Sequence, residues 1–491
     1  MWLLALLLSP ALAFTVQEPT TAAAVRSEPV ERWLDVRLNH FMAHNTETFP
    51  MRYYYNQLND TDENVVIFVG ADWEITPDIT TEGLAYDIAR MLQASVFYTE
   101  FRYYGKTRPT QGTSLSELRY LTVDQALGDL AQFIQHIKSD QFEGGKYSAA
   151  RVVAVGCGLG GSLAAWLRRG YPQLLHAAVA DGARLRAADE APEFLEALTA
   201  AILELGGETC AGALYHAIDD MKSALNTTAG LAQVSSTFNT CTPLLPSSAL
   251  DHTVLFWSIA DSFTTMLQAA TATHYEAACQ VLTDASVSAP MQRLANLVNN
   301  PEECLETRYS EVVANYRRDS YDDPHTTAKL AMYQSCVELG SFRTTAGDSA
   351  FQHTVPLDFY HQLCKDIFST DFDAEYISAG AARTNLMFGG QSLPDYVVGV
   401  QGALAAWRAA GPGAGHASDN APVLLVEGAT QCNAIGPVDE HSSDALIKAR
   451  VDVLNYVNTF INGVPFTDAA SQPIASVITL VLAAILATAA I

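Results

Sequence analysis

The chain has 491 residues, enough for more than one domain, and 49% of them are hydrophobic, an ordinary content for a globular protein. Its 54 acidic and 28 basic residues give a formal net charge of −26, which argues against nucleic acid as a partner because a phosphate backbone would be repelled. The sequence contains no H-E-x-x-H pattern and no tightly spaced Cys/His pairs, so no metal site is expected.

Both ends of the chain carry targeting patterns. Residues 1–13 join an apolar run to Ala11-Leu12-Ala13, the small-x-small pattern of a signal-peptide cleavage site. The C-terminus is an uncharged apolar run without a cationic flank, so residues 467–491 are predicted to be a GPI-attachment signal that leaves a lipid anchor on the membrane. Secretion makes disulfides among the eight cysteines expected, and Asn59 and Asn226 begin glycosylation sequons. We therefore expect a glycoprotein of the secretory pathway, extracellular or at the cell surface.

The first part of the chain, residues 14–186, alternates apolar strands with amphipathic helices. The expected elements are edge strands within Trp33–Tyr55, strands at Asn64–Gly70, Ala94–Tyr98, Arg151–Val155 and Ala177–Ala180, and helices at Gly83–Leu92, Thr122–Lys138 and Leu163–Gly170. Strands that are apolar on both faces predict a mainly parallel sheet covered by helices on each side, an α/β fold.

A helical block then interrupts this pattern. Residues 187–375 show helical periodicity with few strand-like runs, and residues 376–466 return to the sheet pattern. There we expect strands at Asn385–Phe388 and Val423–Val426 and a closing helix at Ala445–Ile461. A block inserted late in such a sheet lies over the carboxyl edge of the strands, where the sites of α/β proteins are found.

A glycine-rich turn joins the Arg151 strand directly to the helix that follows it. Gly156-Cys157-Gly158-Leu159-Gly160 has the frame of the nucleophile elbow G-x-S-x-G, with Gly158 in place of the serine. Gly156, Gly158 and Gly161 also fit the dinucleotide fingerprint G-x-G-x-x-G, and Asp181 lies about where a ribose-binding acid would follow.

Several segments resemble the family of secreted serine peptidases that contains prolyl carboxypeptidase, dipeptidyl peptidase II and thymus-specific serine protease. They are Leu38-Asn39-His40-Phe41, Glu100–Lys106, Leu118–Ile134, Gly156–Pro172 and Tyr333-Gln334-Ser335-Cys336. The resemblance runs in order from about Trp33 to Ile461. It implies an α/β-hydrolase domain with an inserted helical cap, cleavage next to proline at one end of a peptide, a Cys336–Cys364 disulfide and a homodimer. It disfavours the dinucleotide interpretation, so no cofactor is expected.

The resemblance also implies that the catalytic triad is replaced. The family's elbow reads G-G-S-Y-G-G, which puts Gly158 at the nucleophile. Its acid lies in a segment like F-S-N-G-x-L-D-P-W, compared with Phe388–Tyr396 here, which puts Pro394 at the acid; its base lies in G-A-H, which puts Thr430 at the base. The family's G-G-E-G segment, which lines the substrate site, corresponds to Gly70-Ala71-Asp72-Trp73.

Without the nucleophile and its base, no acyl-enzyme is expected. We therefore predict a peptidase homologue that binds a peptide or protein ligand without hydrolysing it, with Asp72, Trp73, Cys157 and Leu159 as candidate binding residues. The alternative is an active serine exopeptidase cleaving next to proline, with a catalytic set rebuilt from residues such as Ser162, Asp395 and His441. Cys157 and Cys432 flank two of the lost positions and form either a disulfide across the site or two buried thiols.

Overall fold

The computed structural model describes residues 28–463 apart from 59–60 and 301. The predicted signal peptide, the predicted GPI-attachment signal and the sequon at Asn59 lie outside these residues.

An eight-stranded sheet with the order β1-β2-β4-β3-β5-β6-β9-β10 forms the centre of the molecule. The β1–β2 and β2–β4 pairs are antiparallel, and all pairs from β4 to β10 are parallel. The strands are β1 Val30–Arg37, β2 Thr48–Asn56, β3 Asn64–Val69, β4 Ser95–Thr99, β5 Arg151–Cys157, β6 Ala177–Asp181, β9 Val397–Gly402 and β10 Val423–Val426.

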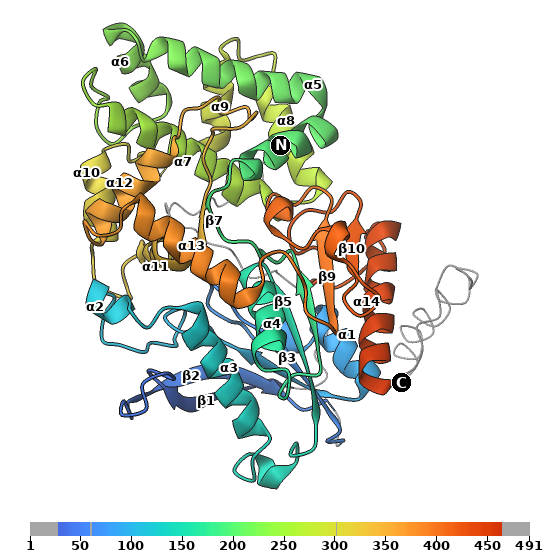
Figure 1. Cartoon of the computed structure of the whole chain (residues 1–491). Coiled ribbons are helices and arrows are strands. Elements are labelled where there is room, and N and C mark those ends of the chain that lie inside the picture. Colours follow the sequence, from blue (N-terminus) through green and yellow to red (C-terminus); the bar gives the residue numbers. More distant parts are fainter. Residues whose placement is uncertain (1–27, 59–60, 301, 464–491) are drawn as a thin grey trace.

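Helices cover both faces of this sheet. Helices α1 (Gly83–Leu92) and α14 (Asp444–Asn462) pack against each other, as do α3 (Val123–Ile137) and α4 (Leu159–Gly170). Burial on both faces explains why the central strands β3 and β6 are apolar except for Asn64 and Asp181 at their ends. The strand order, the parallel connections and the helical insertion are those of an α/β-hydrolase fold, as the sequence predicted (Figure 1).

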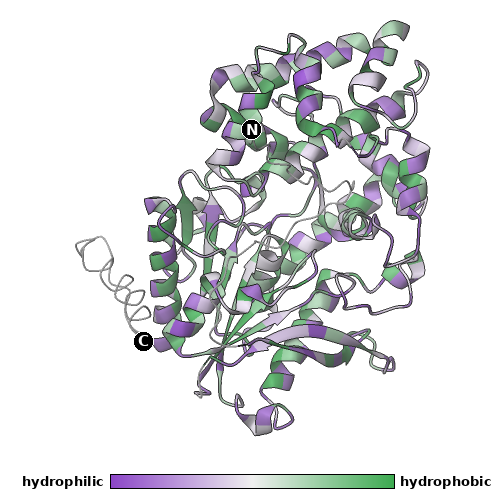
Figure 2. Ribbon diagram, turned by 180° about the vertical axis from the view of Figure 1, so that it is seen from behind, coloured by the Kyte–Doolittle hydropathy of each residue, from purple (hydrophilic) through white to green (hydrophobic). Residues whose placement is uncertain are grey.

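The chain between β6 and β9 forms a helical layer over one end of the sheet (Figure 1). Its helices are α5 Glu193–Ala224, α6 Thr228–Thr237, α7 Ala249–Leu267, α8 Ala272–Leu282, α9 Pro290–Val298, α10 Tyr309–Tyr316, α11 Thr326–Gln334, α12 Leu357–Ile367 and α13 Ala374–Phe388, with the short strands β7 Ala188–Glu190 and β8 Gly340–Phe342. Seen from behind, hydrophobic and hydrophilic residues are interleaved along these helices (Figure 2). Helix α5 is long and apolar enough to cross a membrane by composition, but it packs on α8 and α9 and is tied to α8 by the Cys210–Cys279 disulfide.

One predicted strand is wrong. Asn385–Phe388 is the end of helix α13, and the strand that precedes β10 is β9 at Val397–Gly402. Phe388 packs its ring against Trp166 of α4 with ring centroids 4.9 Å apart. Of the apolar residues in this segment, Phe388 packs against α4, whereas Leu386 and Met387 are exposed.

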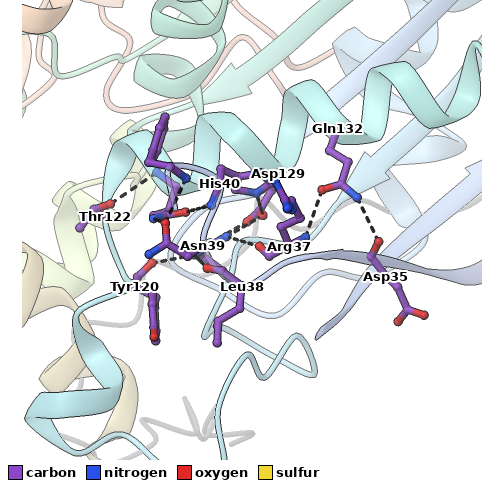
Figure 3. Close-up of polar contacts among 12 residues, drawn as sticks. Asp35, Arg37, Leu38, Asn39, His40, Tyr120, Thr122, Asp129 and Gln132 are labelled. Atoms are coloured by element: carbon purple, nitrogen blue, oxygen red, sulfur yellow. Dashed lines mark hydrogen bonds and ion pairs between the residues drawn. The ribbon is translucent and has the colours of Figure 1, made fainter. Parts of the chain in front are cut away.

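A buried charge network holds the Leu38-Asn39-His40 motif against α3 (Figure 3). Arg102 is completely buried and donates from Nε and Nη2 to the two carboxylate oxygens of Asp129, at 2.7 and 2.6 Å. The His40 Nε2 atom lies 2.7 Å from Asp129 Oδ1, and Arg102 Nη1 donates to the Tyr120 carbonyl at 2.8 Å. These contacts give the motif a structural role in joining β1, β4 and α3.

Candidate functional site

The elbow turn has the predicted geometry, with a glycine at its tip. Gly158 follows β5 directly, precedes α4, and has φ 55° and ψ −121°, a conformation that side chains with a Cβ adopt only under strain. Its amide donates to the Asp181 carbonyl at 2.9 Å. Apart from its two chain neighbours, a Cβ at residue 158 would find one atom of the described residues within 4 Å, Gln431 Nε2 at 3.7 Å. The backbone at residue 158 therefore has the elbow conformation and leaves space for a side chain, although the residue is glycine.

A cavity of about 200 Å³ lies beside the elbow, between the carboxyl edge of the sheet and the helical layer. The four candidate binding residues Asp72, Trp73, Cys157 and Leu159 all line it, as does Gly158. The remaining lining residues are Arg184, Asp261, Thr264, Thr265, Gln268, Ala269, Ala331, Met332, Gln334, Ser335, Leu339, Ser341, Phe342, Arg343, Tyr360, Trp407, Gln431 and Cys432.

Cys157 and Cys432 form a disulfide with Cα atoms 5.6 Å apart, the first of the two arrangements that the sequence left open. The bond joins the elbow to the segment that follows β10, where Thr430 lies. Thr430 is buried, and its hydroxyl donates to the Ala270 carbonyl at 2.8 Å. It is thus close to the elbow in the fold but does not line the cavity.

Pro394 is not where the sequence analysis placed it. It precedes β9, whereas the elbow follows β5, and these strands run parallel through β6, so the two residues lie at opposite edges of the sheet. The Asp395 carbonyl accepts a hydrogen bond from Arg168 in the last turn of α4, about 15 Å along that helix from Gly158. The error follows from the misplaced strand at Asn385–Phe388. The residues that do follow β9 at the elbow's edge are 403–407, which contain no ionisable side chain.

The residues considered for a rebuilt catalytic set are dispersed. The Ser162 hydroxyl is buried and donates to the Arg184 carbonyl at 2.7 Å. His441 is 83% exposed in a surface turn, and Asp395 lies at the far edge of the sheet. The chain has 12 histidines, all within the described residues, and none of them lines the cavity.

The carboxyl group of Asp181 is also occupied within the fold. It is buried and accepts a hydrogen bond from the Ala434 amide at 3.0 Å, and burial raises its pKa to about 7. Asp181 does not line the cavity, so it has no place as a ribose-binding acid.

Two acidic and two basic side chains line the cavity. Arg343 donates to Asp261 at 2.8 Å. Burial raises the pKa of the Asp72 carboxyl, a rise opposed by the charge of Arg184 and by the Asp72 amide. The guanidinium of Arg184 lies over the ring of Trp407, 4.6 Å from its centroid. The sequence analysis missed Arg184 and Trp407; both follow strands at the carboxyl edge of the sheet, and a correct assignment of β9 would have indicated Trp407.

The remaining predicted residues do not line the cavity. Cys336 and Cys364 form the disulfide that the family resemblance implies. Asn226 is exposed immediately before α6, as a glycosylated asparagine requires. Within the described part of the chain, no cluster of three or more His, Cys, Asp or Glu side chains is arranged to hold a metal ion.

Comparison with known proteins gives a family model, curated relatives and solved structures that match this chain. The family model described as Serine carboxypeptidase S28 matches residues 36–453. Thymus-specific serine protease of Mus musculus is 24% identical over 461 residues, which cover 89% of this chain and 88% of the relative. Lysosomal Pro-X carboxypeptidase of Homo sapiens is 28% identical over 234 residues, 46% of each chain. Among solved structures, proline iminopeptidase of Mycobacterium smegmatis aligns with 88% of this chain and 99% of its own, at 9% identity and a TM-score of 0.36.

Proposed function

The chain belongs to the serine carboxypeptidase S28 family, and we propose that it has lost the peptidase reaction and kept the cavity as a binding site for a peptide or a peptide segment of a protein. The observation that carries this proposal is Gly158 at the tip of an otherwise intact elbow, facing a cavity that no histidine lines. An acyl-enzyme needs a nucleophilic side chain, and the nucleophile needs a base to take its proton. Loss of such a set costs roughly 10⁶-fold in rate in a serine protease.

We further infer that Ala405 holds the position of the family's catalytic acid. Gly402, Leu404 and Trp407 have the spacing of the glycine, leucine and tryptophan in the family segment N-G-x-L-D-P-W, which puts Ala405 at the aspartate. The Leu404 amide donates to the Ala429 carbonyl at 2.9 Å, which brings this segment beside Thr430. All three positions of the triad would then carry side chains that neither attack nor transfer a proton.

The alternative, an active exopeptidase that cleaves next to proline, needs a relocated nucleophile and base. The hydroxyls that line the cavity belong to Thr264, Thr265, Ser335, Ser341 and Tyr360, and each lacks a neighbouring histidine there. This arrangement favours binding over hydrolysis.

The test compares the unmodified protein with two triple variants on a library of short proline-containing peptides. We expect no turnover by the unmodified protein and measurable turnover by Gly158→Ser/Ala405→Asp/Thr430→His. The matched variant Gly158→Ser/Pro394→Asp/Thr430→His should stay inactive, because its carboxylate lies at the wrong edge of the sheet. Turnover by the unmodified protein that survives repurification would establish the alternative. Binding of the same peptides to the unmodified protein is measured separately by isothermal titration calorimetry.

The four disulfides and the lysosomal relative indicate the secretory pathway. We propose in addition that the mature protein is held at the cell surface by a GPI anchor and glycosylated at Asn59 and Asn226. Release from intact cells by phosphatidylinositol-specific phospholipase C supports the anchor, whereas a mature chain that ends at Ile491 contradicts it. We also propose a homodimer, which light scattering of the purified protein tests.

A further inference from the structure

The cavity contains a guanidinium that no described residue contacts through a hydrogen bond or an ion pair. Arg184 follows β6 and lies over Trp407, and both side chains line the cavity. A guanidinium carries five N–H donors and remains charged in proteins, and such a group is costly to remove from water without an acceptor. A ligand in the cavity is in a position to supply that acceptor.

The other charges of the cavity leave Arg184 available. Arg343 is paired with Asp261 at 2.8 Å. Asp72 influences Arg184 through its charge, but the two form no ion pair within 4.0 Å. Burial raises the pKa of the Asp72 carboxyl, and the charge of Arg184 opposes that rise. Of the two arginines that line the cavity, Arg184 is therefore the one available to bind an anionic group of a ligand.

The fold holds the Arg184 backbone close to the elbow. The Arg184 carbonyl accepts a hydrogen bond from the Ser162 hydroxyl in the first turns of α4. The carbonyl of Asp181, three residues before Arg184, accepts a hydrogen bond from the Gly158 amide. Leu159, the first residue of α4, lines the same cavity, and the amino end of a helix favours negative charge. The Trp407 ring, 4.6 Å from the guanidinium, holds this side chain by a cation–π contact, which reduces the entropy lost when it binds a ligand.

We propose that Arg184 binds a carboxylate group of the peptide ligand at the position next to Gly158. This inference rests on the peptide-binding function proposed above and adds the chemical class that the cavity selects. A guanidinium matches a carboxylate with two parallel N–H···O bonds, which gives both affinity and orientation. The carboxylate comes either from the C-terminus of the peptide or from an Asp or Glu side chain.

The experiment measures dissociation constants by calorimetry for a proline-containing tetrapeptide library prepared in three forms. The first form has neutral side chains and a free C-terminal acid, the second has neutral side chains and a C-terminal amide, and the third has one Glu and a C-terminal amide. The proteins are wild type, Arg184→Gln, Arg184→Lys and the control Arg186→Gln. Arg186 forms an ion pair with Glu193 and does not line the cavity. Arg186→Gln therefore changes the net charge by the same amount as Arg184→Gln without changing the cavity.

Wild type should bind a carboxylate form more tightly than the neutral amide, and the preferred form identifies the source of the carboxylate. We expect Arg184→Gln to weaken that form about 10- to 100-fold, the range for a lost charged hydrogen bond, and to leave the neutral amide nearly unchanged. Arg184→Lys keeps the charge without the paired donors and should lie between the two. It also serves as the test variant if Arg184→Gln does not fold.

Two other outcomes have different meanings. If wild type binds all three forms equally, or the Arg184 variants bind the carboxylate forms as wild type does, the role of Arg184 is wrong and the peptide-binding function stands. If wild type binds none of the three forms, the proposed function fails and this inference fails with it.

Discussion

Removal of the Cys157–Cys432 disulfide should destabilise the protein more than removal of Cys336–Cys364. The first bond closes a separation of 275 residues and the second a separation of 28. In the chain-entropy treatment these separations correspond to about 5.6 and about 3.6 kcal/mol at 25 °C. The three other disulfides lie inside the larger loop and shorten it, but the dependence on length is logarithmic, so this changes the larger figure by less than about 1 kcal/mol.

The comparison uses the double variants Cys157→Ala/Cys432→Ala and Cys336→Ala/Cys364→Ala. All four cysteines are buried, so the loss of packing is similar in the two variants and the loop difference remains. An unfolding entropy of about 2.1 cal/mol/K per residue gives nearly 1 kcal/mol/K for the described chain, so we expect melting temperatures about 5 and about 4 °C below wild type. Calorimetric scans at one scan rate measure both, because unfolding of a disulfide-linked protein is often irreversible.

An equal or smaller loss in the Cys157/Cys432 variant would refute the reasoning. Thiol titration of the denatured, unreduced wild type is the independent check, and it should find no free thiol among the eight cysteines. Two reactive thiols per chain that map to Cys157 and Cys432 would show that the elbow is not cross-linked.

Two further predictions concern buried charges. Asp129→Asn leaves the fully buried Arg102 without its charge partner and should lower the free energy of unfolding by about 3–5 kcal/mol, measured by thermal or denaturant unfolding. The control Asp322→Asn, at an exposed ion pair, should lower it by less than about 1 kcal/mol. Similar losses in the two variants would contradict a structural role for Asp129. Burial raises the pKa of Glu338 to about 8, so its contribution to stability is present below about pH 4.5 and lost as the pH rises toward 8. The unfolding free energy of wild type should decrease from pH 5 to pH 8.5, and in Glu338→Gln this decrease should be smaller than in wild type by an amount on the order of a few kcal/mol. The exposed control Glu440→Gln should show the decrease of wild type. An unchanged pH profile in Glu338→Gln would argue against the raised pKa.

Local patterns in the sequence were sufficient for most of the sheet and for the elbow. Helix Gly83–Leu92 has the predicted bounds, because its apolar stripe at Leu84, Ile88 and Leu92 faces the sheet. The strand Val397–Gly402 was missed because its two glycines weaken the strand pattern, while the apolar residues of Asn385–Phe388 belong to a packed helix. That single error moved the expected acid to the wrong edge of the sheet. Periodicity separates strands from helices poorly in short apolar runs.

The candidate site depended partly on distances that a sequence does not contain. Asp72, Trp73, Cys157 and Leu159 were found because the family segments that carry them are local. The proximity of Cys157 to Cys432 arises from parallel strands that end at one edge, and eight cysteines allow 105 pairings. Nothing in the sequence indicated Arg184, since an arginine after a strand is usually solvated. The structure shows that Arg184 lies over Trp407 and lines the cavity.

The glycine at residue 158 also makes the molecule a convenient scaffold for a sensor. Gly158 lines the cavity, and apart from its two chain neighbours a Cβ there would find one atom of the described residues within 4 Å, Gln431 Nε2. The positive φ would cost on the order of 1–3 kcal/mol, a strain that elbows of this fold accept at the same position. An environment-sensitive fluorescent amino acid incorporated at that codon would therefore change its emission when the cavity fills. The glycine at the tip of the elbow thus provides an attachment point for an optical reporter of occupancy.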